Sequence, residues 1–339
     1  MKKKKRKSGI MLCVMALVCL VLMTVTGCGS TPISEKETAE IFAMDTIMDL
    51  TVYGEPASEL LTEARQLVQK YEGLFSVNTR TSDVAKLNQA SGRAVQVSPE
   101  TYELIQKSIE ISKETEGFFD ISIYPLVRAW GFTKEEYRVP EPEELGRLLE
   151  KVDASKIRLE PDNRVTLPEG MEIDLGGIAK GYLSQKLTEL FREGGAQAAV
   201  VSLGGNVQTF GKKPDGTPFV VGITDPSDGS SVLGTIQVGE KAVITSGSYQ
   251  RYFEKDGKVY HHIIDKRTGA PAQSDLTSVT VIGEDGVTAD SLATALFVMG
   301  KERAVQFAAS HPEIQLVLVD TESQVWTSEG IEMEENSES

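Results

Sequence analysis

The first 27 residues limit most strongly what this 339-residue chain can fold into, because they have the pattern of a secretion signal. Six cationic side chains at residues 2–7 precede an almost wholly apolar stretch at residues 10–25. That stretch is shorter than a comfortable membrane span and is typical of the hydrophobic region of a signal peptide. We therefore expect residues 1–27 to be removed and the fold to be built from the rest.

Cys28 follows this stretch directly, in the sequence Val25-Thr26-Gly27-Cys28. A branched residue and two small residues before a cysteine resemble a bacterial lipobox, in which the cysteine is diacylated and becomes the mature N-terminus. Two acyl chains are enough for stable membrane attachment. The alternative is an uncleaved anchor helix with an incidental cysteine. Both interpretations place the domain at the extracytoplasmic face of the cell membrane.

Cysteine usage restricts the chemistry. Of the three cysteines, Cys13 and Cys19 lie inside the leader and Cys28 would carry lipid. The mature chain then has neither a disulfide nor a cysteine nucleophile. The remaining length of roughly 310 residues can bury a sizeable core as one large domain or two interlocked ones.

The net charge restricts the partners. Loss of the six leader cations changes the formal charge from −15 to about −21. Such an acidic body argues against binding of nucleic acid or of an anionic membrane surface. A bound anionic cofactor would need a metal ion or helix dipoles to offset the repulsion.

Hydrophobic periodicity predicts a mixture of helices and strands between residues 41 and 328, after a polar tether at residues 28–40 and before an acidic, frayed tail at residues 329–339. The mixture indicates an α/β or α+β fold with too few helices for a barrel of eight βα units. We expect helices at residues 59–75, 98–116, 141–150, 178–193 and 290–310, a strand or strand pair at 41–53, and strands at 157–159, 165–167, 173–175, 198–203, 219–223, 235–238, 242–245, 276–282 and 314–319.

The first candidate site is the glycine-bearing segment at residues 172–181, where a predicted strand meets a helix. Free N–H groups and the helix dipole at such a point favour an anion such as phosphate. Gly176 and Gly177 allow close approach of a ligand, and Lys180 could neutralise phosphate. An ordinary strand–helix turn with an exposed lysine explains the same pattern.

The second candidate is the pair Asp290 and Thr294, four residues apart at the predicted start of a helix. Both oxygens would project from one helix face. A carboxylate and a hydroxyl are hard ligands suited to Mg²⁺ or Ca²⁺. The alternative is that Asp290 is a helix N-cap, the commoner role of aspartate at that position.

The third candidate is His261-His262, on a predicted strand that allows only one of the two to face a site. The absence of another cluster of His, Asp and Glu argues against a zinc hydrolase. The chain also lacks a G-x-S-x-G elbow, which leaves serine acyl chemistry unsupported. The small-residue turn at residues 245–249 could donate hydroxyls to a phosphate or could serve as a turn alone.

The order of these segments resembles the ApbE family of flavin transferases, over nearly all of residues 41–320. The matching blocks are residues 43–46, 118–122 with 130–132, 174–182, 202–206, 245–249, 262–265 and 290–294. The resemblance implies an α/β fold with duplicated antiparallel sheet-and-helix units, the T-fold-like core of that family.

The resemblance also implies a set of site residues. Mg²⁺ would be held by the side chains of Asp290 and Thr294 and by the carbonyl oxygens of Gly177 and Ala293. A family contact with FAD that is often aromatic falls near Asn78. The residues that would line the FAD site are Met44, Asn78, Ala129, Trp130, Gly131, Phe132, Asp174, Lys180 and Ile264.

The implied activity is Mg²⁺-dependent transfer of FMN from its substrate FAD to a threonine or serine hydroxyl of a target protein, with release of AMP. Such phosphoryl transfer needs positioning and charge neutralisation more than covalent groups from the protein. His262 is the candidate base. The family implies acceptors among membrane electron-transfer proteins. The alternatives are a Mg²⁺-dependent FAD pyrophosphatase and a non-catalytic FAD-binding lipoprotein.

Overall fold

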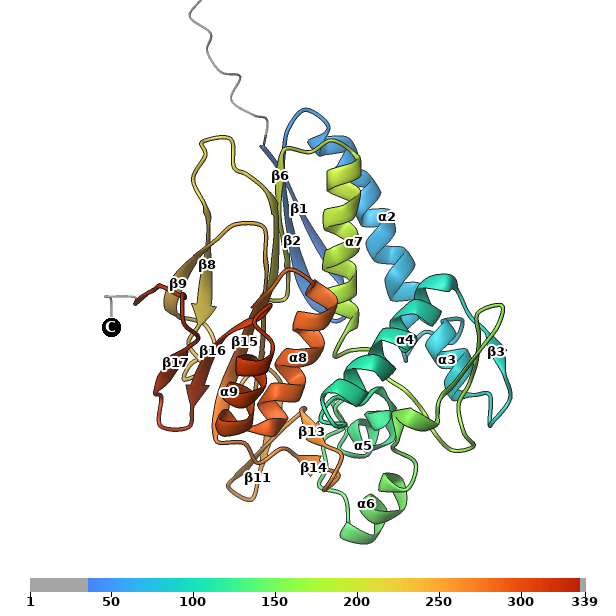
Figure 1. Ribbon diagram of the computed structural model, residues 1–339. Helices are drawn as coiled ribbons and strands as arrows, with labels where there is room; N and C mark the ends of the chain where they lie inside the picture. The colour runs from blue at the N-terminus through green and yellow to red at the C-terminus, as the bar shows by residue number, and fades with distance from the viewer. Residues whose placement is uncertain (1–35, 336–339) are drawn as a thin grey trace, which may run out of the picture. The chain divides into compact units, whose positions relative to one another are not determined.

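An eight-stranded antiparallel sheet forms the centre of the computed structural model, which describes residues 36–335 (Figure 1). The predicted signal peptide at residues 1–27 and the predicted lipidation site Cys28 lie outside the described residues. The strand order is β1-β2-β6-β7-β10-β15-β16-β17. Every neighbouring pair in this order is antiparallel.

The sheet is built from two copies of one unit: a strand pair, a helix pair and a second strand pair. The copies join where β7 pairs with β10. This arrangement confirms the α/β fold and its duplicated antiparallel sheet-and-helix core. The first copy comprises β1 (Lys36–Ala43), β2 (Thr46–Tyr53), α2 (Ala57–Phe75), α7 (Ala179–Glu193), β6 (Ala198–Leu203) and β7 (Asn206–Gly211), and the second comprises β10 (Ala242–Gly247), β15 (Leu276–Gly283), α8 (Gly286–Met299), α9 (Lys301–Ser310), β16 (Gln315–Asp320) and β17 (Val325–Thr327).

Alternation along the strands supplies both faces of the sheet with apolar side chains. In β6, Ala199 and Val201 face the main core with the helices, whereas Ala198 and Val200 face a second, smaller core. A three-stranded sheet of β8 (Phe219–Thr224), β9 (Val232–Val238) and β18 (Met333–Glu335) covers that second face. The central sheet therefore lies between a helical layer and a small sheet (Figure 1).

Two insertions bring further segments to one end of the sheet. A third apolar cluster, which includes Leu126, Trp130, Phe132 and Ile264, joins the two insertions. The longer one separates α2 from α7 and contains α3 (Asp83–Asn88), β3 (Val95–Gln96), α4 (Pro99–Glu114), η1 (Ile121–Ile123), α5 (Tyr124–Ala129), α6 (Pro142–Leu149), η2 (Ala154–Lys156), β4 (Arg158–Glu160) and β5 (Arg164–Thr166), while the one between β10 and β15 contains β11 (Tyr252–Lys255), β12 (Lys258–His261), β13 (Ile264–Asp265) and β14 (Ala270–Pro271).

The expected single helix at residues 290–310 is wrong in its bounds. Gly300, with a φ of +82°, separates α8 from α9. The helix α8 begins at Gly286, and its N-cap is Asp285, whose side chain accepts the N–H of Val287. Asp290 therefore lies in the second turn and is not an N-cap.

Three other boundary expectations also fail. Residues 173–175 are not a strand, because the Asn88 side chain, rather than a neighbouring strand, bonds both the N–H and the carbonyl of Ile173. Strand β1 begins at Lys36, inside the predicted tether. The predicted frayed tail contains β18, which pairs with β9.

Within residues 36–335, no helix combines the length and the hydrophobicity that crossing a membrane requires.

Candidate active site

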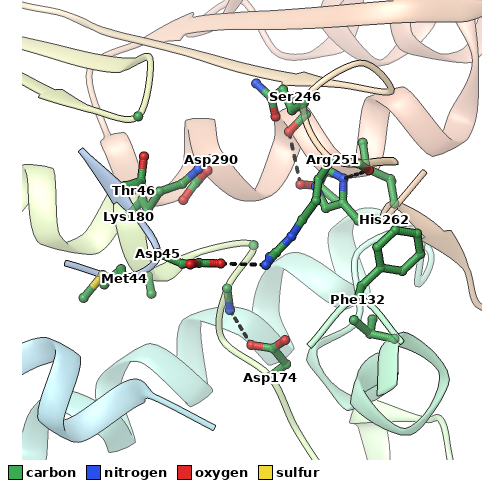
Figure 2. Close-up of a pocket in the computed structure, with 18 of the residues that line it drawn as sticks. Met44, Asp45, Thr46, Phe132, Asp174, Lys180, Ser246, Arg251, His262 and Asp290 are labelled. Atoms are coloured by element: carbon green, nitrogen blue, oxygen red, sulfur yellow. Dashed lines mark hydrogen bonds and ion pairs between the residues drawn. The ribbon is translucent and has the colours of Figure 1, made fainter. Parts of the chain in front are cut away.

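One cavity of about 1560 Å³ gathers most of the residues that the sequence singles out. This volume exceeds the roughly 300–1,000 Å³ usual for a single small-molecule ligand. Its walls come from the β1–β2 turn, the long insertion, the start of α7, the segment after β10 and α8 (Figure 2). The predicted residues that line it are Met44, Asn78, Phe132, Asp174, Gly177, Lys180, His262, Ile264, Asp290 and Thr294.

Ala129, Trp130, Gly131 and Ala293, also predicted for the site, do not line this cavity. Trp130 is buried behind the wall, where its indole N–H donates to the carbonyl of Gly269 over 2.8 Å. Gly131 has a φ of +86°, and a Cβ there would lie 2.1 Å from a main-chain oxygen. These residues hold the turn that carries Phe132 to the cavity wall.

The β1–β2 turn carries two residues in the left-handed region, Met44 and Asp45, with φ of 48° and 61°. The Met44 N–H donates to the Glu72 carboxylate over 2.9 Å. The Asp45 carboxylate accepts from the Arg251 guanidinium over 2.6 Å. Sequence reasoning missed this ion pair, which joins two walls of the cavity (Figure 2).

Asp290 is only 4% exposed. Its carboxylate accepts the main-chain N–H of Gly181 over 2.8 Å and the Asn206 amide over 3.0 Å. Burial raises the pKa of the Asp290 carboxyl group, against the opposing effect of the Lys180 charge and of these hydrogen bonds. A buried carboxylate whose charge is poorly compensated is suited to a cation.

The contact between α7 and α8 brings Asp290 close to the main chain of α7. An ideal Cβ on Gly181 would lie 2.2 Å from the Gly286 carbonyl oxygen and 2.7 Å from Cβ of Asp290. Only glycine fits this approach without displacing backbone.

The oxygens around Asp290 fit a hard divalent cation. Thr294 lies one turn further along α8, and its hydroxyl is 3.3 Å from that of Ser246. An ideal Cβ on Gly177 would lie 3.8 Å from the same Thr294 oxygen, which places Gly177 beside it. The Asn206 amide oxygen is buried without a hydrogen-bond partner.

Residues 36–335 contain no cluster of three or more His, Cys, Asp and Glu side chains that could hold a metal. A cation here would need main-chain and ligand oxygens to complete its coordination shell. Mg²⁺ is commonly bound in this way, through one or two protein oxygens together with substrate phosphates.

His262 faces the cavity with a defined tautomer. The Arg251 carbonyl oxygen lies 3.0 Å from the His262 main-chain N–H and 3.2 Å from Nδ1 of its ring. Because a carbonyl only accepts, Nδ1 carries the proton and Nε2 keeps a free lone pair. The adjacent His261 is turned to the core, where its Nε2 contacts the Ala272 carbonyl over 3.0 Å. Only one of the two histidines faces the cavity.

Burial lowers the pKa of His262 to about 3; the Arg251 carbonyl opposes this shift, and the positive charges of Lys180 and Arg251 add to it. The ring is therefore neutral at physiological pH and able to accept a proton. Phosphate groups bound near Lys180 would offset these positive charges and so raise the pKa of His262.

Lys180 lies in the first turn of α7, a helix without a side-chain N-cap, and Asp174 lies in the segment that leads into it. Asp174 accepts the N–H of Gly176 over 2.8 Å, and burial raises its pKa. Lys180 supplies positive charge beside the cavity. Asn78 also lines the cavity, in the segment that follows α2.

The sequence model of the ApbE family matches residues 44–318. An FAD:protein FMN transferase of Klebsiella pneumoniae is 34% identical over 77% of this chain and 82% of its own length. One of Treponema pallidum is 33% identical over 93% and 92%.

Solved structures of ApbE proteins also match this fold. The ApbE protein of Thermotoga maritima superposes with a TM-score of 0.82 at 34% identity, over 87% of this chain and 97% of the other. The flavin transferase ApbE of Vibrio cholerae superposes with a TM-score of 0.79 at 29% identity, over 87% and 98%.

Proposed function

This chain belongs to the ApbE family, and we propose that it is an FAD:protein FMN transferase that attaches FMN to a threonine or serine of another protein. The observation that carries the proposal is the presence of His262 and Asp290 on the walls of one cavity, each with its orientation fixed by main-chain groups.

The reaction balances without a covalent enzyme intermediate. The acceptor hydroxyl oxygen forms a bond to the FMN phosphorus of FAD. The bond from that phosphorus to the bridging oxygen of the diphosphate breaks, and AMP leaves with the electron pair. The hydroxyl proton passes to Nε2 of His262, which is free because Nδ1 is bonded to Arg251.

The other residues of the site would position FAD and neutralise the charge of its diphosphate. Asp290, Thr294 and the carbonyl of Gly177 would hold Mg²⁺, with Ala293 supplying a further carbonyl by family resemblance. When bound, Mg²⁺ would neutralise charge on the diphosphate. Lys180 adds positive charge at the start of α7, where helix N–H groups also favour phosphate. Met44, Asn78, Phe132 and Ile264 lie where they can contact FAD.

The alternatives use the same site. In a pyrophosphatase, water replaces the acceptor hydroxyl and free FMN accumulates. A binding lipoprotein yields neither product. The size of the cavity supports transfer, because it exceeds the volume usual for a single small-molecule ligand.

The test uses the full chain purified in detergent and incubated with FAD, Mg²⁺ and the purified acceptor domain of a membrane electron-transfer protein. Transfer gives a fluorescent acceptor band and an FMN-sized mass gain on the acceptor. Free FMN without that mass gain would favour hydrolysis, and neither product would favour a binding protein.

We also propose that the protein is lipidated at Cys28, anchored at the extracytoplasmic face of the membrane, and acts on electron-transfer proteins there. The support is the sequence pattern at residues 1–28. Intact mass measurement of the mature N-terminus tests the lipid. A Cys28→Ala variant that remains membrane-bound, with no lipid on the wild type, would contradict it.

A further inference from the structure

The exposed aromatic side chains of residues 36–335 are concentrated at one place. Phe42, Tyr137 and Tyr252 are 73%, 37% and 52% exposed, and no other Phe, Tyr or Trp among these residues is exposed to that degree. All three line the cavity. Since each is both exposed and cavity-lining, they lie at its mouth.

A fourth apolar side chain extends this surface. Ile47 is 53% exposed and pairs directly with Phe42 across the β1–β2 hairpin. Phe42, Ile47, Tyr137 and Tyr252 are here called the apolar rim. Strand β1 is also an edge strand of the large sheet, so no strand of the described chain covers its outer side.

The two sides of the apolar rim are held together. Tyr252 follows Arg251, whose guanidinium bonds Asp45 near Phe42 over 2.6 Å. Tyr137 stacks on Phe253, the residue after Tyr252, with ring centroids 5.1 Å apart. These two contacts tie the segments that carry the rim residues to β11 and its preceding residue.

Exposing several large apolar side chains around one opening is costly unless a partner covers them. Aromatic side chains supply much of the binding energy in protein interfaces. The cavity interior differs, since it carries the charged groups of Asp174, Lys180 and Asp290, which suit a cation and phosphates. The rim and the interior thus suit different ligands.

We propose that the apolar rim is the docking surface for the acceptor polypeptide, which places its hydroxyl-bearing segment in the cavity and its flanking apolar side chains on Phe42, Ile47, Tyr137 and Tyr252. The proposal rests on the proposed function. A folded acceptor cannot enter the cavity whole, so its reactive segment must cross this mouth to reach His262. Apolar contact also suits a partner of this acidic chain, whose formal net charge is −15 with the leader and about −21 without it, because such contact does not depend on a complementary charge.

The test compares Phe42→Ser, Tyr252→Ser and their double variant with the wild type, all as full chains in detergent. The readouts are the KM for a purified acceptor domain of a membrane electron-transfer protein and the Kd for FAD alone, from quenching of flavin fluorescence. The double variant should raise the acceptor KM about tenfold or more, with the FAD Kd changed less than about twofold. Val325→Ser is the matched control, because Val325 is 37% exposed on β17 at the other edge of the sheet and does not line the cavity.

Two results would overturn the docking proposal while leaving the function intact. One is an unchanged acceptor KM in the double variant; the other is an FAD Kd that weakens in parallel, which would assign the rim to the cofactor. Absence of transfer by the wild type would instead refute the proposed function, and the docking proposal with it.

Discussion

The main-chain carbonyl oxygen of Arg251 lies 3.2 Å from Nδ1 of His262 and holds the ring with Nε2 free. The Arg251 side chain is in turn anchored to Asp45, on the opposite wall. One residue thus connects the candidate base to the β1–β2 turn (Figure 2).

His262→Gln should lower the rate of transfer by roughly 10²- to 10⁴-fold, because the acceptor hydroxyl loses its proton acceptor. The Kd for FAD should change little. Single-turnover kinetics separate the two effects. His311→Gln, at the end of α9 and outside the cavity, is the control and should keep full activity. Full activity of His262→Gln would remove the base assignment.

The lowered pKa of His262 predicts that the folded chain becomes less stable as the pH decreases. Below pH 6.5 the unfolded chain protonates this ring, whereas the folded chain does so only near pH 3. The free energy of unfolding should therefore fall as the pH decreases, by about 2 kcal/mol from this group between pH 7 and pH 5. Urea unfolding at pH 7 and pH 5 measures this change. The decrease in the free energy of unfolding should be smaller in His262→Gln than in the wild type, by about that amount. An equal drop in both proteins would refute a His262 ring that stays neutral in the folded chain.

Asp290→Asn should abolish transfer and yet stabilise the ligand-free protein, by on the order of 1 kcal/mol, because it removes a charge whose burial is unfavourable. If Asp290 holds Mg²⁺ as proposed, Mg²⁺ and FAD together should stabilise the wild type, and the variant should lack this stabilisation. Thermal unfolding with and without these ligands measures both effects. Asp320→Asn, at the end of β16 and away from the cavity, should retain transfer. Unchanged transfer in Asp290→Asn would refute the metal assignment.

Gly181→Ala should destabilise the protein by about 3 kcal/mol and lower activity, because the new methyl group meets the Gly286 carbonyl and displaces α8 with Asp290. Urea unfolding and the transfer assay measure the two consequences. The control is Gly146→Ala in α6, where a Cβ meets no atom within 4 Å and alanine should be neutral or stabilising. Equal stability of the two variants would contradict the close approach of α7 and α8.

Asp45→Asn should change the free energy of unfolding by less than about 1 kcal/mol, because the Asp45–Arg251 pair is largely exposed. Asparagine tolerates the left-handed conformation at this position, so the turn should persist. We nevertheless expect the rate of transfer to fall roughly tenfold or more, since Arg251 positions His262. A rate equal to that of the wild type would show that the ion pair does not contribute to positioning.

Much of the architecture could be predicted from sequence, because helix periodicity and strand alternation are local signals. Residues 59–75 carry an amphipathic stripe, and α2 covers Ala57–Phe75. The strand predicted at residues 173–175 is wrong, because the side chain of Asn88, which is distant in sequence, takes the place of a strand partner. The break between α8 and α9 at Gly300 also depends on tertiary context. The carboxylate of Asp275, a residue outside both helices, accepts the main-chain N–H of Lys301 at the start of α9.

The candidate site was predictable where a motif marks it and not where two distant segments meet. Lys180, His262 and Asp290 are found from local pattern together with family resemblance. Asp45 and Arg251 are 206 residues apart, and nothing in either neighbourhood predicts their ion pair. Trp130 belongs to a matching block, yet packing turns it toward Gly269 and away from the cavity.

The most direct measurement is the intact mass of an acceptor domain after incubation with the full chain, FAD and Mg²⁺, with AMP measured in the same sample. The proposed function predicts a gain of one FMN per acceptor, one AMP released for each FMN attached, and no gain with Asp290→Asn. Release of AMP and free FMN with no mass gain on the acceptor would contradict it.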